Sequence, residues 1–223
     1  MPGADRLPLR AVARTRRQTL LRVWGDHAFA RWRPSVRGVV LDLASGSGAS
    51  YRQQWDGAAQ VVGVDLDRRR HPDAVADLLR PLPFRPGSAD VVVLSWFLYI
   101  APAPTAVLEQ VADVLRPGGR LLLSVPLVFP FTPEPTDHWR FTAEGVSLVL
   151  RQAGFTDVEV VPLGDRWAAA VSLVDPFLRP RPVLAPLAYG AAVLLDRLAA
   201  RLGRGWSPCP IGYAVRAVKG GAR

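Results

Sequence analysis

The sequence predicts an α/β protein built on a doubly wound, largely parallel sheet. Four near-continuous apolar runs have the pattern of strands that helices cover on both faces; these runs are residues 38–43, 60–65, 90–96 and 120–126. Between and after them, residues 107–115 and 146–153 place apolar side chains at helical spacing. Strands that alternate with helices in this way form a parallel sheet, and ligands bind at the carboxyl ends of its strands.

The most informative stretch follows the first predicted strand. Here Asp42 is followed by small residues and glycines, in the order Ala44-Ser45-Gly46-Ser47-Gly48. Glycine allows a ligand to approach the backbone closely, and the start of the next helix offers free N–H groups at the same place. The next apolar run ends in a second acid, Asp65, which suits the hydroxyls of a ribose. The pattern predicts a site for a nucleoside-containing cofactor.

The residues of this loop argue against a dinucleotide or a phosphate loop. The dinucleotide pattern G-x-G-x-x-G fails because position 51 is Tyr51, and no Gly-Lys-Ser/Thr follows. The segment instead resembles motif I of the class I S-adenosylmethionine (SAM)-dependent methyltransferases, usually D-x-G-x-G-x-G, with Ala44 in place of the first glycine. A tight turn without a ligand is the alternative for this loop taken alone.

Three further segments resemble the same family in the same order. Residues 77–93 resemble the stretch in which an acid after the third strand meets the adenine amino group. Residues 115–121 resemble the turn before the fifth strand, and residues 140–155 resemble the late helix of the small-molecule, type 11-like branch. The resemblance covers about residues 38–162 and a last strand near 211–219, and it implies a Rossmann-like sheet of seven strands.

The resemblance also implies a set of residues that hold SAM. The implied cofactor-binding residues are Asp42, Ala44, Ser45, Gly46, Gly48, Asp65, Leu66, Asp77, Leu78 and Ser95. No metal is expected, since the single cysteine, Cys209, excludes a cysteine-cluster metal site and an internal disulfide. The three histidines are too scattered to indicate zinc.

Methyl transfer from a sulfonium is an in-line displacement, in which the protein mainly aligns the acceptor with the methyl group. A hydroxyl acceptor also needs a base. The candidates after the fourth and fifth predicted strands are Tyr99, Asp137 and His138. Tyr99 stands where many relatives carry a histidine, whereas His138 offers an imidazole, a common general base. Alternatively, this segment is structural, with Arg140 paired to a carboxylate and His138 merely exposed.

The predicted function is a SAM-dependent methyltransferase that acts on a sugar, natural-product or lipid-like acceptor. Residues 137–142 resemble members associated with glycan and natural-product biosynthesis. One alternative is an RNA methyltransferase, although residues 95–98 lack the Asn/Asp-Pro-Pro-Tyr/Phe motif. Another is a binding protein that kept the fold and lost catalysis, against which the acids and glycines of the cofactor segments argue.

Much of the net charge of +9 lies in residues 1–37, which contain nine arginines and two acids. Because the chain as a whole strongly prefers arginine to lysine, this excess is interpreted as compositional bias, and no specific nucleic-acid binding is expected. Residues 1–37 are predicted to form a basic helical segment that precedes a methyltransferase domain at 38–223. Within it, residues 10–33 are expected to form one helix that docks on the domain through an apolar stripe. The alternative is a basic arm that binds nucleic acid or an anionic membrane surface.

Residues 164–210 are predicted to be a hydrophobic helical insertion before the last strand. The uncharged stretch 182–195 contains two prolines and is shorter than the roughly 20 residues of a bilayer span. A cover over the substrate pocket or a homodimer contact is favoured. The alternative is peripheral membrane contact through 167–204, where arginines meet lipid headgroups. No secretory signal is recognised, and a cytoplasmic enzyme is expected.

Overall fold

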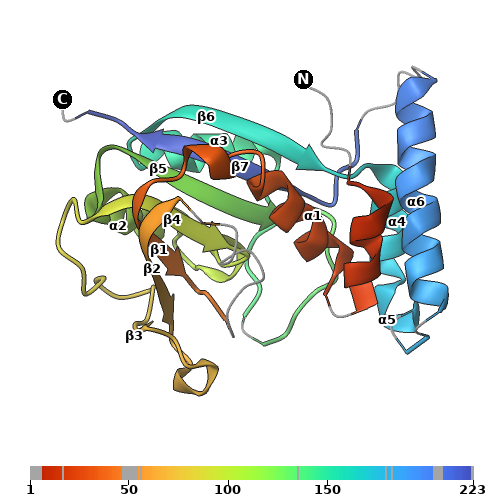
Figure 1. Cartoon of the computed structure of the whole chain (residues 1–223), viewed down its shortest axis with the longest axis horizontal. Helices are drawn as coiled ribbons and strands as arrows, with labels where there is room; N and C mark the ends of the chain where they lie inside the picture. Colours follow the sequence, from red (N-terminus) through yellow and green to blue (C-terminus); the bar gives the residue numbers. More distant parts are fainter. Residues whose placement is uncertain are drawn as a thin grey trace.

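The computed structural model describes residues 7–16, 18–46, 55, 57–134, 136–178, 180–181, 183–202 and 208–221. One seven-stranded sheet runs through its centre in the order β3-β2-β1-β4-β5-β7-β6 (Figure 1). The strands are β1 (Gly38–Leu43), β2 (Ala58–Asp65), β3 (Ala74–Val75), β4 (Ala89–Ser95), β5 (Leu115–Pro126), β6 (Phe155–Leu163) and β7 (Gly212–Lys219). The first five are parallel to one another, and β7 lies between β5 and β6, antiparallel to both. The predicted doubly wound α/β sheet is confirmed.

The helices connect and flank the strands. They are α1 (Leu20–Phe29), α2 (Pro104–Val114), α3 (Ala143–Gln152), α4 (Arg166–Leu173), α5 (Asp175–Leu178) and α6 (Leu184–Arg201), with 3₁₀ turns η1 (Leu9–Arg16), η2 (Arg33–Ser35), η4 (Arg68–Arg70) and η5 (Leu98–Ile100). Leu115 was expected on the face of the helix before β5, and that expectation is wrong. It is already extended and pairs with Ala89. Pro117 disfavours helical backbone at Arg116, so α2 does not continue beyond this point.

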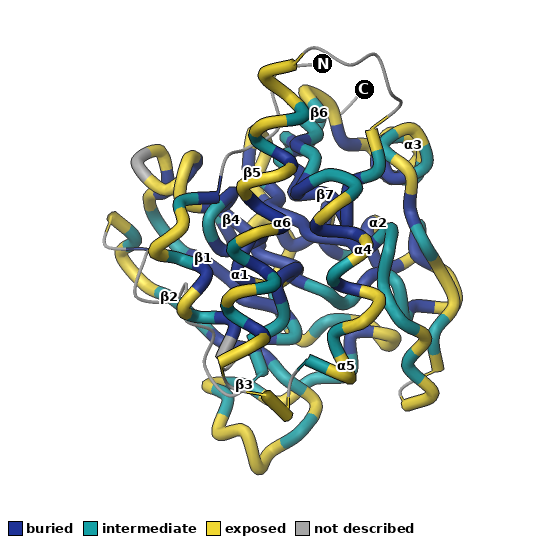
Figure 2. Tube along the Cα trace, turned by 90° about the vertical axis from the view of Figure 1, so that its right-hand side faces the viewer, coloured by how far each residue is buried: buried dark blue, intermediate teal, exposed yellow. Residues whose placement is uncertain are grey.

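Two apolar cores lie on opposite faces of the sheet. Successive residues of a strand point to opposite faces, so Val91 and Val93 of β4 pack with α1 and the insertion, while Val92 and Leu94 pack with α2 and α3. Figure 2 shows the strands as dark, buried stretches at the centre of the molecule. Burial on both faces explains the near-continuous apolar runs of the central strands.

The N-terminal segment docks on the second of these cores, but not as one helix. Residues 10–33 form η1, then α1, then the start of η2. Thr19 ends the first element, since its backbone is extended and its hydroxyl caps α1 by accepting from the Arg22 amide (3.2 Å). An ion pair between Arg14 and the buried Asp26 ties η1 to α1. The predicted single helix is therefore wrong, while the docked position matches the expectation.

The insertion forms a helical layer at one end of the molecule, where α6 lies beside η1 and α4 (Figure 1). Asp196 of α6 joins the helices because its carboxylate accepts from the amides of Asp165 (3.0 Å), Trp167 (2.9 Å) and Ala168 (3.1 Å) at the start of α4. Burial raises the pKa of Asp196 above its ordinary value. Among the described helices, none is long and apolar enough to cross a membrane.

Candidate cofactor and acceptor site

A cavity of about 740 Å³ opens at the carboxyl ends of β1, β2 and β4. This volume lies within the usual range for small-molecule and cofactor sites. The cavity, called here the cofactor cleft, is lined by Arg22, Ala44, Gly46, Asp65, Leu66, Asp67, Arg69, Arg70, Ala76, Asp77, Leu78, Leu79, Ser95, Trp96, Phe97, Tyr99, Ile100, Pro102, Thr136 and His138. Its position is the one that a parallel sheet offers to a ligand.

Asp65 holds the loop after β1 in place. Its carboxylate accepts from the Gly46 amide (2.8 Å) and from the Asp67 amide (2.9 Å). Gly46 has a φ of +63°, and a Cβ there would come within 3.2 Å of the Arg70 guanidinium. Ala44 also has a positive φ, of 57°, a conformation that costs a non-glycine residue about 1 kcal/mol. Alanine thus occupies a turn position in which glycine is the unstrained residue.

The structure brings most of the predicted cofactor residues together in the cofactor cleft. Ala44, Gly46, Asp65, Leu66, Asp77, Leu78 and Ser95 all line it. Two others support the loop from below: Asp42 is fully buried within β1, and the Ser45 amide donates to the Val64 carbonyl oxygen (2.9 Å). Gly48 lies outside the described residues.

Charged side chains that the sequence did not single out also line the cofactor cleft. These are Arg22 from α1, Asp67, and two arginines of η4, Arg69 and Arg70. The Arg69 guanidinium, hydrogen-bonded to Asp67, lowers the pKa of that carboxyl to about 2. Arg69 and Arg70 belong to a run of three arginines in a chain that is rich in arginine, so their residue type is not informative. Only their position just after β2 indicates that they could bind a ligand.

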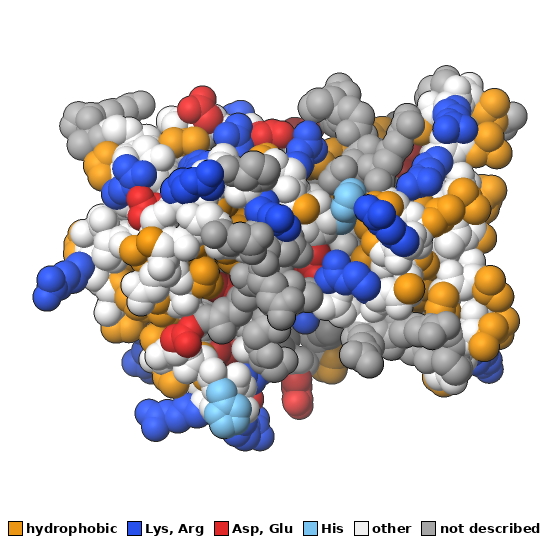
Figure 3. Space-filling model, viewed as in Figure 1, with side chains coloured by type: hydrophobic (Ala, Val, Ile, Leu, Met, Phe, Trp, Pro, Cys, Tyr) orange, Lys and Arg blue, Asp and Glu red, His pale blue; other side chains and the backbone are white. Residues whose placement is uncertain are grey.

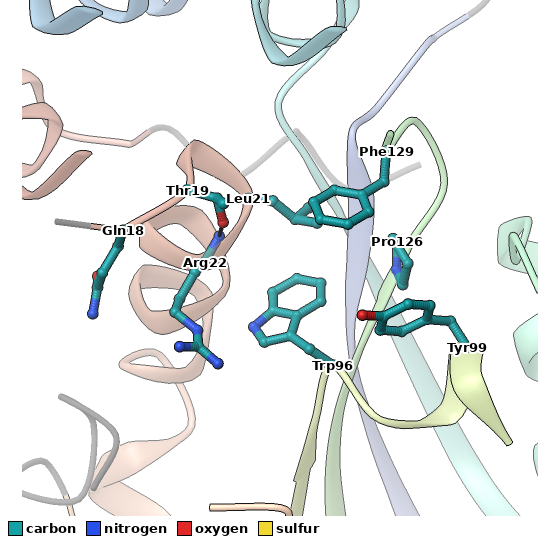
Figure 4. A pocket seen from close by; sticks show the side chains of 8 residues that line it. All are labelled: Gln18, Thr19, Leu21, Arg22, Trp96, Tyr99, Pro126 and Phe129. Carbon is teal, nitrogen blue, oxygen red and sulfur yellow. Dashed lines mark hydrogen bonds between the residues drawn. The ribbon is translucent and has the colours of Figure 1, made fainter. Parts of the chain in front are cut away.

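A second, smaller cavity of about 280 Å³ adjoins the cofactor cleft and shares Arg22, Trp96 and Tyr99 with it. It is called here the acceptor cavity, and its lining residues are Gln18, Thr19, Leu21, Arg22, Trp96, Tyr99, Pro126 and Phe129. Figure 4 shows the three aromatic rings facing the side chains at the start of α1. The N-terminal segment therefore forms one wall of this cavity, next to the end of β4.

Trp96 lines both cavities and has an unusual backbone conformation. Its φ is +56°, which is rare for a bulky residue and is often found at functional sites. Its amide donates to the Ser124 carbonyl oxygen (3.1 Å). The indole packs against Gly25 of α1 so closely that a Cβ at that glycine would lie 2.6 Å from Trp96 Cζ2. From the sequence, Ser95 is the predicted site residue at the end of this strand. Including the next residue of the same strand end would have identified Trp96 as well.

Asp137 supports the aromatic wall rather than lining either cavity. Its side chain is 2% exposed and forms an ion pair with Arg140, and it accepts from the Thr132 amide (3.2 Å). This pair lowers the pKa of Asp137. The Arg140 guanidinium carbon lies 5.9 Å from the ring centres of both Tyr99 and Phe129, which suits cation–π contacts. Asp137 thus orients the arginine that backs the two rings.

The other two candidate catalytic residues do line the cofactor cleft. Tyr99 is half-buried, and this burial raises the pKa of its phenol. His138 is exposed, and its amide donates to the Tyr99 carbonyl oxygen (3.0 Å). The loop after β5 is therefore joined to η5 by backbone as well as by side chains. Within the described residues, no three His, Cys, Asp or Glu side chains are grouped to hold a metal ion.

Comparison with known proteins agrees with this geometry. Residues 41–123 match a family model described as a methyltransferase domain. A demethylmenaquinone methyltransferase from Beutenbergia cavernae is 37% identical over 110 residues, which is 45% of this chain and 45% of that protein. Methyltransferase str3 from Strobilurus tenacellus is 35% identical over 95 residues, covering 38% and 34%. The chain thus spans about half or less of the length of these curated relatives.

Solved structures share the fold. A SAM-dependent methyltransferase from Archaeoglobus fulgidus superposes with a TM-score of 0.61 at 17% identity, over 89% of this chain and 94% of the other. Phosphoethanolamine N-methyltransferase 2 from Haemonchus contortus, in complex with SAM, gives 0.57 at 20% identity, over 88% and 52%. The strand order, the glycine turn after β1 and the match over residues 41–123 agree with one another: the chain has the fold of these methyltransferases, and this segment matches the methyltransferase domain family.

Proposed function

We propose that this chain is an enzyme that transfers a methyl group from SAM to a small-molecule acceptor. The observation that carries the proposal is the shared wall of Arg22, Trp96 and Tyr99, through which the cofactor cleft and the acceptor cavity adjoin. Two ligands held on either side of such a wall are brought into the proximity that displacement chemistry requires. The chain itself aligns the two ligands. The family match over residues 41–123 and the curated methyltransferase relatives support the same chemistry.

The residues of the cofactor cleft fit SAM. Asp65 offers carboxylate oxygens to ribose hydroxyls, and Asp77 stands at the end of the next strand for the adenine amino group. The bend at Gly46 keeps the backbone open beside Asp65. When bound, SAM supplies a methyl group on a positively charged sulfur. Leu66 and Leu78 supply apolar contact for the base, while Asp42 and Ser45 hold the loop from beneath.

The lining of the acceptor cavity favours a ring-bearing acceptor over a sugar. Three aromatic side chains and Leu21 enclose it, and no carboxylate is among its described lining residues. Aromatic walls stack planar rings, whereas sugar sites use many hydrogen-bonding side chains. Two of the curated relatives are demethylmenaquinone methyltransferases, and their name refers to a quinone. A quinone-like acceptor would be consistent with the predicted natural-product or lipid-like class. Arg22 supplies a positive charge for an oxygen substituent on that ring.

Proton removal from a hydroxyl acceptor is assigned to His138. Its side chain lines the cofactor cleft near Tyr99, and an imidazole is a suitable base. Tyr99 acts as a neutral hydrogen-bond donor, because burial raises the pKa of its phenol. Asp137 is a positioning residue through Arg140.

Calorimetry with SAM tests the cofactor assignment. The Asp65→Asn variant, which removes one acceptor oxygen, should weaken SAM binding about tenfold or more, since hydrogen bonds to a charged group contribute about 1.5–3 kcal/mol. Asp113→Asn is the matched control, because that exposed carboxylate of α2 is absent from the lining of both cavities, and it should bind SAM as the wild type does. Equal affinities in all three proteins would contradict the role of Asp65.

Turnover is tested by methyl transfer to a library of acceptors, with release of S-adenosylhomocysteine as the readout. Ring-bearing hydroxyl acceptors should react, and His138→Gln should reduce kcat for them while leaving SAM affinity unchanged. A chain that binds SAM but methylates no member of the library would instead favour the non-catalytic binding protein. An RNA acceptor is the remaining alternative, and only the net charge of +9 favours it.

A further inference from the structure

The outer side of α6 is a continuous stripe of exposed leucines. Most of them stand three, four or seven residues apart, which places them on one side of the helix, and between 39% and 64% of each is exposed. The stripe, called here the α6 face, consists of Leu184, Leu187, Leu194, Leu195, Leu198 and Leu202. The opposite side of α6 carries Tyr189 and Val193 into the core. Monomeric proteins rarely leave so long an apolar stripe open.

The apolar surface continues beyond α6 in two directions. At the α5 end, Phe177 is 71% exposed and Leu173 is 55% exposed. Along the side of α6, a cavity of about 460 Å³ separates it from η1, where Leu9 and Val12 line the opposite wall. Figure 3 shows these apolar side chains gathered at the right-hand edge of the molecule, with arginines beside them. The α6 face is therefore part of one wider apolar surface.

Exposed arginines surround this surface. Arg181 precedes the α6 face, Arg201 stands at its end, and Arg10 lies on the neighbouring η1. None of the acids in the described residues of η1, α1 and α4 to α6 is fully exposed. Asp26 and Asp196 are buried, where they bind Arg14 and the start of α4, and the half-buried Asp175 accepts from the Tyr189 hydroxyl. The apolar surface thus has a rim of positive charge.

We propose that the α6 face docks on an anionic membrane surface. An apolar stripe flanked by arginines is complementary to a bilayer interface with anionic headgroups, and α6 is not a membrane span. A second copy of the chain fits less well, since a two-fold contact through the same face would bring the arginine rims of both copies together without an exposed acid from these elements to offset them.

The insertion also contributes to a cavity beside the acceptor cavity. This cavity of about 220 Å³ is lined by Ser172 and Pro176 of the insertion, and by Thr19, Leu21 and Phe129, which also line the acceptor cavity. Pro176 of this cavity precedes the exposed Phe177, so docking would bring the cavity close to the bilayer, from which an apolar acceptor could enter. Entry of the acceptor rests on the proposed function, whereas the docking proposal rests only on the apolar and charged residues of the surface.

Vesicle sedimentation tests the proposal with the full chain. Wild-type protein should sediment with vesicles of equal parts phosphatidylcholine and phosphatidylglycerol, and much less with phosphatidylcholine alone. Replacing two leucines of the α6 face, as Leu187→Gln with Leu198→Gln, should lower the bound fraction about tenfold or more, because both side chains lose their apolar contact with lipid. Leu148→Gln is the matched control: it is an equally exposed leucine on α3, in the other helical layer, and should bind as the wild type does.

SAM affinity and thermal unfolding are measured on the same three proteins to verify that each is folded. These measurements distinguish a loss of membrane binding from a loss of the cofactor site. Undiminished vesicle binding by the double variant, or no binding by a folded wild type, would overturn the proposal. A wild-type dimer in sedimentation velocity that the double variant abolishes, without vesicle binding, would assign the α6 face to a second copy instead.

Discussion

At the residue scale, the site depends on side chains whose role the sequence leaves open. Asp137 and Arg140 stand three positions apart, a spacing equally consistent with a catalytic acid and with a structural ion pair. Burial decides between them, because the carboxylate is turned away from both cavities. Burial of one polar side chain in a loop depends on contacts such as the one with Thr132, and no periodicity in the sequence encodes these.

The Asp137→Asn variant is expected to lower the free energy of unfolding by about 2 kcal/mol near neutral pH, because it breaks a largely buried, charged hydrogen bond. The ion pair holds the pKa of Asp137 below its ordinary value of 3.8. Its stabilisation is therefore fully present above that pH and is lost as the pH falls through the lowered value. Urea unfolding near neutrality and at about pH 3 measures this, and the difference between the two proteins should shrink at the acid end.

Asp113→Asn is the control for this measurement, since Asp113 is exposed on α2 and its replacement should change the unfolding free energy little at either pH. A difference between wild type and Asp137→Asn that stays constant down to about pH 3 would show that the carboxylate does not act through its charge.

At the element scale, the apolar runs predicted the central strands well because burial on both faces leaves a strong pattern. The boundaries failed where one local residue overrides the pattern: Pro117 converts the end of a predicted helix into strand, and Thr19 divides the N-terminal segment. The position of the insertion was not predictable either. None of the residues of α6 lines the cofactor cleft or the acceptor cavity, so the expected cover over the pocket is wrong for this helix.

The contact between α1 and the end of β4 depends on a missing side chain. Gly25→Ala should destabilise the fold by about 1 kcal/mol or more, since the new Cβ would lie 2.6 Å from Trp96 Cζ2 and force the indole to move. Gly190→Ala on α6 has no atom within 4 Å of the new Cβ, and should stabilise the fold by about 0.5–1 kcal/mol through helix propensity. Thermal unfolding of the two variants compares them directly, and a stabilised Gly25→Ala protein would contradict the packing described for Trp96.

At the scale of the whole molecule, charge and location were the hardest properties to predict. The net charge of +9 is consistent with nucleic acid, with an anionic membrane and with arginine bias, and only the arrangement of charge in space separates these. Around α6, Asp26 and Asp196 are buried while Arg10, Arg181 and Arg201 are exposed, a pattern that composition alone does not contain. The domain boundary at residue 38 and the cytoplasmic location stay predictions, as does the absence of a specific nucleic-acid partner.

RNA binding should be weak and independent of sequence. Contacts between arginines and phosphates release counterions, so affinity should fall by about a hundredfold or more between roughly 50 mM and 200 mM salt. Fluorescence anisotropy with two unrelated RNA sequences of equal length is the measurement, and both should give the same curve. Tight binding of one sequence that persists at high salt would favour the RNA methyltransferase.

The N-terminal segment belongs to both functional surfaces. Through Thr19, Leu21 and Arg22 it forms a wall of the acceptor cavity, and through η1 it forms one side of the groove against α6, with Arg14 and Asp26 joining the two parts. A ligand that alters the position of this segment on one side therefore changes the free energy of binding on the other. Thermodynamic reciprocity then requires both effects to be the same size. If a bound bilayer changes the affinity for the acceptor by a given factor, a bound acceptor changes the affinity for the bilayer by the same factor.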